Sequence, residues 1–518
     1  MLRFSTALSL LCILFIITGC NTCNPRGGSL AFVKTWDVPA GQTYTFDDPT
    51  EGLNSVDFIA RVFYPATDDT GAEVLEGEHP LVIFGHGRFG PTSGSGFPNN
   101  YLHATYLLNQ LTSWGYICVT VNFDVVSSLG FGISERGELF LKAVDFMLAE
   151  NNKPSSRFFH RINTSQIGLI GHSRGGGGAT SAVRRNQAQG SPRNIKALAT
   201  ISPTSSDTGP ITGGMPQLMI YGTWDGDLSS APGYELWDAA PRDKDKAYVE
   251  VYGANHFFFS DDLFYNHEVN GISRQNHQNM AKGFINAFFD QQIRGLNRFG
   301  WPDYLTYIRK VDTVEYYVQY LNGTKTIIDD GGVVGPATAN NLGGTNTAVS
   351  MPLFDNADLG SGTGQFGSTI GIRMSWDAGA DRVDFTIPAT NASAFDFISF
   401  RASQRHNVTG NTLNTFKTLK VKLTDGGGNT FTQSISNSVY KGLQYPDQEV
   451  YPDLGNPPNT INGSFKNIPS TFRLKLSTFT GVNLGNIVKV TILFDAPNSS
   501  GFVNNTGAIT FDDLEFTK

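Results

Sequence analysis

Between residues 40 and 300, short continuous apolar runs alternate with stretches whose apolar residues recur at helical spacing. The apolar runs are HPLVIFGHG, YICVTVNF, QIGLIGHS, IKALATISP, PQLMIYGTWD and KAYVEVYGANH, and the helical stretches include YLLNQLTSWG, SERGELFLKAVDFMLAEN and QNMAKGFINAFFDQQIRG. Strands that alternate with helices predict an α/β fold, in which a mostly parallel sheet is covered by helices on both faces. Ligands of such sheets bind beyond the carboxyl ends of the strands.

The pattern changes from about residue 325 onward, where helical spacing disappears and Gly, Asn and Thr dominate. The segments FDFISFRAS, LKVKLTD, TFRLKLST, IVKVTILFD and AITFDDLEF alternate apolar and polar residues, with turns between them. This pattern is typical of an antiparallel β-sandwich. We therefore predict an α/β domain over residues 40–300, a linker over 301–324 and an all-β sandwich over 325–518.

The N-terminus has the features of a targeting segment. Arg3 precedes the apolar run ALSLLCILFIIT. The run is too short, and lies too close to the N-terminus, to be a typical membrane-spanning helix, although an uncleaved anchor is an alternative. The sequence Ile17-Thr18-Gly19-Cys20 resembles the lipobox of bacterial lipoproteins. That resemblance implies removal of residues 1–19, lipid attachment at Cys20, a tail over 20–39 and a place in the bacterial cell envelope, at the outer membrane or cell surface.

Composition agrees with an extracytoplasmic protein of more than one domain. The chain has 518 residues, of which 57 are glycine and only 16% are charged. A net charge of -8 without a basic block argues against a nucleic-acid partner. The 4 cysteines predict neither a disulfide framework nor a zinc site, because one leaves with the signal segment and Cys20 carries the lipid.

One motif carries chemistry. Gly171-His172-Ser173-Arg174-Gly175 has the form G-x-S-x-G, and it follows the apolar run IGLI and precedes a helix-compatible run of small residues. A serine hydroxyl is a useful nucleophile only when it is exposed on a sharp turn beside a base. No Lys-Ser/Thr follows, so the motif is not a phosphate-binding loop. We interpret Ser173 as a nucleophile on a strand-to-helix elbow.

An acid and a base should follow the serine in chain order, each just beyond a strand. Asp225 follows the run LMIYG and His256 follows VEVYG. His256 is then the base that takes the serine proton, and Asp225 orients its ring. Asp227 is an alternative acid, whereas His267 and His277 are weaker candidates for the base because they lie in or near helical segments.

The tetrahedral intermediate of ester hydrolysis needs two backbone N–H donors for its oxyanion. One is the N–H of Arg174, directly after the nucleophile, and the other is the N–H of Arg88 in FGHGRFG. Phe89, Trp224 and Phe257 stand next to these motifs and are candidates for lining a substrate pocket, although aromatic residues near a motif often belong to the core.

The set FGHGRFG, IGHSRGG, YGTWDGD and GANHFFF resembles bacterial α/β-hydrolases of the chlorophyllase, platelet-activating-factor acetylhydrolase and dienelactone-hydrolase-like groups. The resemblance covers about residues 40–300. It implies a Ser173–Asp225–His256 triad that hydrolyses carboxylic esters through an acyl-enzyme, with no catalytic cofactor or metal. Dienelactone hydrolases proper use cysteine as the nucleophile, so their substrate is not implied.

The C-terminal segments resemble jelly-roll carbohydrate-binding and galactose-binding-like modules. Such modules often hold a structural calcium ion, to which Asp512 or Asp513 could contribute, although a solvated turn is an equal alternative for these aspartates. The modules bind sugars through exposed aromatic rings. The candidate rings are those of Trp376, Tyr440, Tyr445 and Tyr451, and the alternative, which we favour, is that they pack the sandwich or its loops. The resemblance implies a polysaccharide partner for residues 325–518.

Together these observations predict an envelope-anchored serine esterase acting on polysaccharide-linked, lipid or polyester substrates. Two alternatives are a surface glycan-binding lipoprotein with a non-catalytic hydrolase scaffold, and a phospholipase of the platelet-activating-factor acetylhydrolase type.

Overall fold

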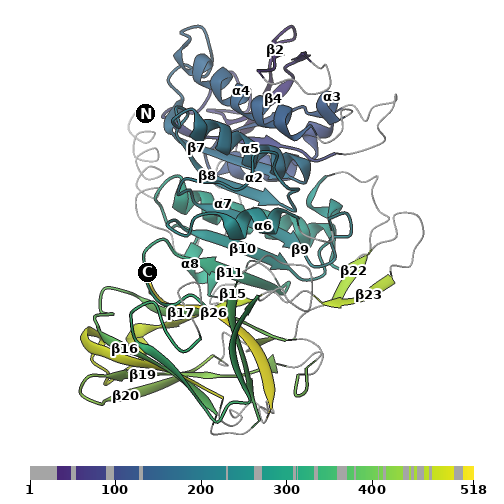
Figure 1. The fold of residues 1–518 in the computed structure, drawn as a ribbon. Coiled ribbons are helices and arrows are strands. Elements are labelled where there is room, and N and C mark those ends of the chain that lie inside the picture. Colours follow the sequence, from purple (N-terminus) through teal and green to yellow (C-terminus); the bar gives the residue numbers. More distant parts are fainter. Residues whose placement is uncertain are drawn as a thin grey trace.

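The computed structural model places most of the chain beyond residue 31 in two layered domains (Figure 1). The described residues are 32–47, 54–88, 99–127, 132–228, 232–261, 271–306, 311, 313–331, 337–358, 370–377, 381–405, 408–411, 416–435, 443–444, 448–451, 460–465, 469–494 and 506–518. Within these residues, no helix combines the length and the apolar character needed to cross a membrane.

The first domain is built on a nine-stranded sheet whose strand order is β1-β4-β6-β5-β7-β8-β9-β10-β11. The strands are β1 (Val33–Asp37), β4 (Ala60–Pro65), β5 (His79–Gly85), β6 (Ile117–Val121), β7 (Ile162–His172), β8 (Ile195–Ile201), β9 (Gln217–Gly222), β10 (Lys246–Val251) and β11 (Tyr316–Leu321). The strands from β6 to β10 are parallel, whereas β1, β4 and β11 pair antiparallel at the two edges. The six predicted strands are the six parallel ones.

Helices cover both faces of this sheet, as predicted. They are α2 (Thr105–Ser113), α3 (Asp124–Ser127), α4 (Ile133–Asn152), α5 (Arg174–Ala188), α6 (Pro232–Ala239), α7 (Arg274–Gln292) and α8 (Trp301–Leu305). One core contains apolar residues of α2, α7 and α8, and the other contains those of α4 and α5. The continuous apolar runs form strands here because each strand is buried on both faces.

The segment 301–324 is not a linker. It contains α8 and the edge strand β11, whose Val318 and Leu321 are fully buried. β11 pairs with β10 over its whole length, from Tyr316 opposite Val251 to Leu321 opposite Lys246. The alternation in YYVQYL is a strand pattern, so the α/β domain extends to the start of the β-rich domain.

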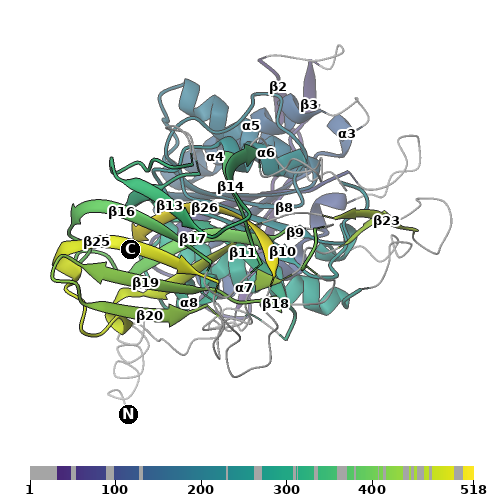
Figure 2. The same ribbon diagram turned by 60° about the horizontal axis from the view of Figure 1, so that its bottom comes forward.

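The second domain consists mainly of two antiparallel sheets. One has the order β14-β15-β26-β17-β24, with β12 also pairing β26, and the other has the order β13-β16-β25-β19-β20. Their bounds are β12 (Lys325–Asp329), β13 (Thr345–Val349), β14 (Leu353–Asp358), β15 (Ile370–Trp376), β16 (Arg382–Thr390), β17 (Phe397–Gln404), β19 (Lys420–Asp425), β20 (Thr430–Ser434), β24 (Ser470–Lys475), β25 (Ile487–Leu493) and β26 (Gly507–Thr517). Both sheets contribute to one apolar core, so this part is β-rich and layered (Figure 2).

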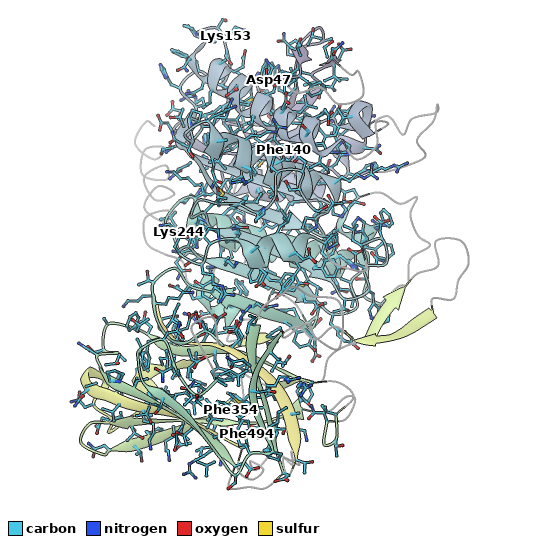
Figure 3. All side chains as sticks on the ribbon, in the orientation of Figure 1. Asp47, Phe140, Lys153, Lys244, Phe354 and Phe494 are labelled. Carbon is cyan, nitrogen blue, oxygen red and sulfur yellow. The ribbon has the colours of Figure 1, made fainter. Side chains whose placement is uncertain are left out.

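Each domain has its own apolar interior. Phe140 of α4 is buried in the first domain and Phe494 in the second, and the two side chains lie far apart (Figure 3). The domains meet where β11 runs beside β24, with the Tyr320 N–H donating to Oγ1 of Thr471 at 2.8 Å. The contact is therefore made by regular strands of both domains.

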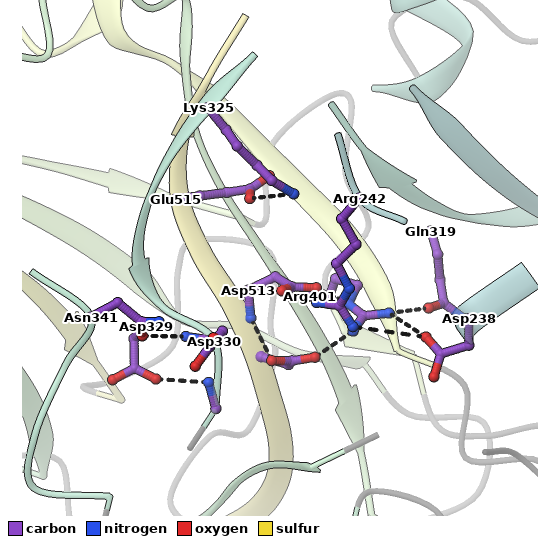
Figure 4. A network of polar contacts seen from close by, with 12 residues as sticks. Asp238, Arg242, Gln319, Lys325, Asp329, Asp330, Asn341, Arg401, Asp513 and Glu515 are labelled. Carbon is purple, nitrogen blue, oxygen red and sulfur yellow. Dashed lines mark hydrogen bonds and ion pairs between the residues drawn. The ribbon is translucent and has the colours of Figure 1, made fainter. Parts of the chain in front are cut away.

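A buried ionic cluster lies at this boundary (Figure 4). Arg401 of β17 is 1% exposed; its Nη1 donates to Oε1 of Gln319 at 2.8 Å, and its Nε lies 2.6 Å from Oδ2 of Asp513. A second arginine, Arg242, pairs with the other oxygen of Asp513 at 2.5 Å, and Asp512 pairs with Nη2 of Arg401. Arg401 thus joins a strand of the first domain to the last strand of the second.

Candidate active site

Ser173 lies on a strained turn between β7 and α5. Its backbone angles are φ 56° and ψ -125°, a conformation that costs an L-residue free energy and persists only where the surroundings impose it. A Cβ atom at Gly171 would lie 2.2 Å from the carbonyl oxygen of Gly175, and one at Gly175 would lie 2.1 Å from that of Gly85. Both flanking glycines are therefore required for the close approach of β5, β7 and α5. The predicted elbow is the observed geometry.

Asp225 and His256 form a buried pair beyond the ends of neighbouring strands. Asp225 follows β9 and His256 follows β10, and Oδ2 of Asp225 lies 2.8 Å from Nδ1 of His256. The other carboxylate oxygen accepts the Leu228 N–H at 2.8 Å. Burial opposes ionisation of Asp225, but His256 and this backbone donor outweigh it and keep the pKa of Asp225 below its ordinary value.

The alternative acid, Asp227, lies at the opposite nitrogen of the same ring. Its Oδ2 is 3.5 Å from Nε2 of His256, and its side chain is 37% exposed. The imidazole therefore has a buried carboxylate at Nδ1 and a solvent-accessible carboxylate near Nε2. Only Asp225 lies where it can orient the ring while leaving Nε2 for proton transfer.

His172 holds the backbone of His256 beside the elbow. Its Nε2 donates to the carbonyl oxygen of His256 at 3.1 Å, and the two rings lie 5.0 Å apart. Burial, together with the neighbouring His256, lowers the pKa of His172 to about 3, so its ring is neutral. This residue, adjacent to the nucleophile, has a positioning role.

His277, the weaker candidate for the base, is bonded to backbone at both nitrogens. Its Nε2 accepts the Asn255 N–H at 2.8 Å, and its Nδ1 donates to the carbonyl oxygen of Ser273 at 2.8 Å. It supports the loop that carries His256. His267 lies outside the described residues.

The loop after β5 runs directly past Ser173. A Cβ atom at Gly87 would lie 2.7 Å from Cβ and 3.2 Å from Oγ of Ser173. Arg88 follows Gly87, and Arg174 is the first residue of α5. The two predicted oxyanion donors therefore belong to the two backbone segments that border the nucleophile. No acceptor for the Arg88 N–H lies among the residues that the structure describes.

Arg174, the residue after the nucleophile, is half-buried near other charged side chains. Burial, with Arg88 as the next cause, lowers the pKa of Arg174, while Asp227 acts in the opposite direction. The two guanidinium groups therefore lie close enough to repel each other.

The predicted pocket residues differ in their surroundings. Trp224 is half-buried and packs against Gly271, where a Cβ atom would lie 2.7 Å from Cε3 of the indole. Phe257 is 6% exposed, and its ring meets that of His256 edge-on at 5.0 Å. Phe89 and the lipidation candidate Cys20 lie outside the described residues.

The candidate ligand residues of the β-rich domain that the structure describes are buried. Asp512 and Asp513 are buried and paired with Arg401 and Arg242, so they do not form a solvated turn. Trp376 is 2% exposed and stacks on Phe494 at 4.5 Å, so it is a core residue and not a sugar platform. The side chains of Tyr440, Tyr445 and Tyr451 lie outside the described residues.

The described residues contain no group of three or more His, Cys, Asp or Glu side chains arranged to hold a metal ion. A structural calcium ion in the β-rich domain therefore stays a prediction, without the two ligands first considered for it.

Part of the chain is similar to known ester hydrolases. Residues 95–280 match the family described as "PETase: PET hydrolase-like". A "Bis(hydroxyethyl) terephthalate hydrolase" from Streptomyces coelicolor is 24% identical over 216 residues, which is 37% of this chain and 65% of the relative. "Cutinase est2" from Thermobifida alba is 25% identical over 166 residues, or 31% and 50% of the two chains.

"Cutinase 1" from Thermobifida cellulosilytica is 26% identical over 163 residues, covering 31% of this chain and 58% of the relative. This chain thus spans half to two thirds of the length of these relatives. The matched region contains Ser173, Asp225 and His256, and it is similar to a family of ester hydrolases.

Proposed function

We propose that this protein is a serine carboxylic-ester hydrolase in which Ser173 is the nucleophile, His256 the general base and acid, and Asp225 the residue that orients His256. The observation that carries the proposal is the buried pair of Asp225 and His256 beside a serine on a strained elbow. The matched family of PET hydrolase-like proteins supports the same class of reaction.

Acylation begins when Oγ of Ser173 attacks the ester carbonyl carbon and its proton passes to Nε2 of His256. The carbonyl oxygen becomes an oxyanion, which the N–H groups of Arg88 and Arg174 stabilise. The intermediate collapses, the bond between the carbonyl carbon and the alcohol oxygen breaks, and His256 returns the proton to the departing alcohol. The ionised Asp225 stabilises the imidazolium in between.

Deacylation repeats the sequence with water. Nε2 of His256 takes a proton from water, whose oxygen attacks the acyl carbon of the Ser173 ester. The second tetrahedral intermediate expels Oγ of Ser173, which regains its proton from His256. The products are a carboxylic acid, the alcohol and the free enzyme.

We propose first that the substrates are polyesters or the small diesters that are fragments of them. The named relatives include cutinases and a bis(hydroxyethyl) terephthalate hydrolase, and half-buried Trp224 next to Asp225 offers an aromatic surface beside the site. Acyl esters on polysaccharides and lipid esters are further candidate substrates to be tested. We also propose lipid attachment at Cys20 and an envelope location.

A kinetic panel tests the proposal. The purified chain should hydrolyse p-nitrophenyl acetate, p-nitrophenyl butyrate and bis(hydroxyethyl) terephthalate, and Ser173→Ala should abolish all three activities without lowering the melting temperature. Ser165→Ala is the matched control and should retain full activity, because this exposed serine lies near the start of β7, at the opposite end of the strand from Ser173. Equal activity of Ser173→Ala and the wild type would contradict the proposal.

A further inference from the structure

A fully buried arginine reaches the loop that borders the nucleophile. Arg136 lies on the first turn of α4 and has 0% exposure. Its Nη1 donates to the carbonyl oxygen of His86 at 2.9 Å. The two residues are 50 positions apart in the sequence, so the contact joins α4 to the end of β5.

Burial of the Arg136 guanidinium disfavours its charged form. Burial, followed by the nearby Arg174, lowers the pKa of Arg136 to about 9, and Asp124 and Glu135 only partly offset these effects. Its Cζ lies 5.0 Å from the centre of the Phe123 ring. A guanidinium with 0% exposure beside an aromatic ring is stabilised only by specific polar contacts, because an apolar side chain of the same size would otherwise fill the space at lower cost.

The loop that Arg136 contacts is held at two successive peptide groups. Arg136 binds the carbonyl oxygen of His86, and Nδ1 of His86 donates to the carbonyl oxygen of Gly87 at 2.7 Å. Nε2 of His86 accepts the Phe123 N–H at 2.8 Å, which fixes the tautomer with the proton on Nδ1. Burial, with Arg136 as the next cause, holds the pKa of His86 well below its usual value, so the ring stays neutral.

Each of these carbonyl contacts also sets the direction of an N–H group. In a planar trans peptide the C=O and N–H bonds point in opposite directions, so a fixed carbonyl oxygen fixes the N–H of the next residue. Arg136 therefore orients the peptide between His86 and Gly87, and His86 orients the peptide between Gly87 and Arg88. The N–H of Arg88, the proposed oxyanion donor, belongs to the second of these peptides.

We propose that Arg136 is a positioning residue for the reaction: it anchors the loop 86–88 so that the backbone N–H of Arg88 faces the oxyanion that forms beside Ser173. This inference rests on the proposed function and adds to it a residue that touches neither substrate nor the Asp225–His256 pair. An N–H group whose direction is fixed by a buried hydrogen bond stabilises the transition state without reorganising during the reaction.

The loss of this anchor should lower kcat more than it changes KM, because the oxyanion exists in the transition state and not in the bound ester. We expect Arg136→Met to lower kcat about 10- to 100-fold, less than the loss on deleting an oxyanion donor outright. Arg136→Lys keeps one long donor and should recover part of kcat.

Arg294 provides a matched control in the same domain. Its Nη1 donates to the carbonyl oxygen of Trp114 at 2.8 Å, and its Cζ lies 3.9 Å from the centre of the Tyr116 ring. Trp114 and Tyr116 precede β6, so they lie at the N-terminal ends of the parallel strands, whereas Ser173 lies at the C-terminal ends. Arg294→Met therefore removes the same kind of contact away from the site.

The experiment compares wild type, Arg136→Met, Arg136→Lys and Arg294→Met by three measurements: kcat and KM on p-nitrophenyl butyrate, melting temperature, and hydrogen exchange of peptides that cover residues 84–88. We expect faster exchange at 84–88 and a lower kcat in Arg136→Met only, partial recovery in Arg136→Lys, and a melting temperature similar to that of Arg294→Met.

Unchanged exchange at 84–88 in Arg136→Met would overturn the inference, and so would faster exchange with an unchanged kcat. Equal losses of kcat in Arg136→Met and Arg294→Met would also overturn it, since both would then follow from general destabilisation. Wild-type protein without esterase activity would contradict the proposed function instead, while the exchange data would still decide whether Arg136 anchors the loop.

Discussion

Oδ2 of Asp225 lies 2.8 Å from Nδ1 of His256, and both side chains are buried, whereas Asp227 approaches the same ring at Nε2 from solvent. Two carboxylates that are two residues apart in one loop thus contact opposite nitrogens of one imidazole. Their positions define different roles, and substitution can separate those roles.

Asp225→Asn should lower kcat/KM on p-nitrophenyl butyrate by about 10³- to 10⁴-fold, because an amide at Nδ1 favours the wrong tautomer of His256 and cannot stabilise the imidazolium. Asp227→Asn is the matched control and should change kcat/KM by less than about tenfold, because its carboxylate is partly exposed and screened by solvent. The reverse order of effects would make Asp227 the triad acid.

The elbow predicts a second contrast, between two glycines. Gly175→Ala should destabilise the fold and abolish activity, because the new methyl group would lie 2.1 Å from the Gly85 carbonyl oxygen. Gly190→Ala should cost only about 1–2 kcal/mol, because Gly190 has φ +79° but nothing within 4 Å of its Cβ position. Denaturant unfolding measures both, and equal costs would show that the elbow can relax.

The sequence predicted the sheet and the site unevenly, for physical reasons. β5 to β10 were predictable because fully buried strands are continuous apolar runs, and Ser173, Asp225 and His256 because each follows such a run. The role of Arg136 was not predictable, because its partner is a backbone carbonyl 50 residues away. Every residue has such a carbonyl, so the sequence does not show which one the side chain contacts.

The boundary of the domains was predicted wrongly for a related reason. β11 is a short strand whose partner, β10, precedes it by more than 60 residues, and no local pattern shows that the two strands pair. For the aspartates in FDDLEF, the sequence allowed calcium ligation near the last strand or a solvated turn, but both residues are buried inside β26 against arginines from other elements.

The ionic cluster between the domains gives a prediction about stability. Arg401→Met should lower the free energy of unfolding by about 3–5 kcal/mol, because it removes the buried arginine that contacts both Asp512 and Asp513. Arg373→Met removes a partly exposed pair with Asp355 in the same domain and should cost about 0–1 kcal/mol. Denaturant unfolding of the full chain measures both, and similar costs would contradict the role given to Arg401.

Glu515 predicts a dependence of stability on pH. Burial raises its pKa to about 7, although Lys325 at 3.3 Å acts in the opposite direction. The folded chain therefore keeps a proton that the unfolded chain releases, so this contribution is complete below the unfolded pKa, about 4.3, and is lost as pH rises through 7.

Glu515→Gln should accordingly flatten the decline of melting temperature between pH 5 and 8 relative to wild type. Asp396→Asn, at an exposed aspartate of the same domain, is the control and should leave the decline unchanged. Parallel curves for wild type and Glu515→Gln would refute this assignment.

Covalent labelling of the folded protein with a fluorophosphonate, followed by peptide mass spectrometry, tests directly whether Ser173 is an activated nucleophile. We expect one adduct on Ser173, which is absent from Ser173→Ala and forms much more slowly in Asp225→Asn. A folded wild-type chain that takes up no label, or takes it up on another residue at the same rate in all three proteins, would contradict this role of Ser173.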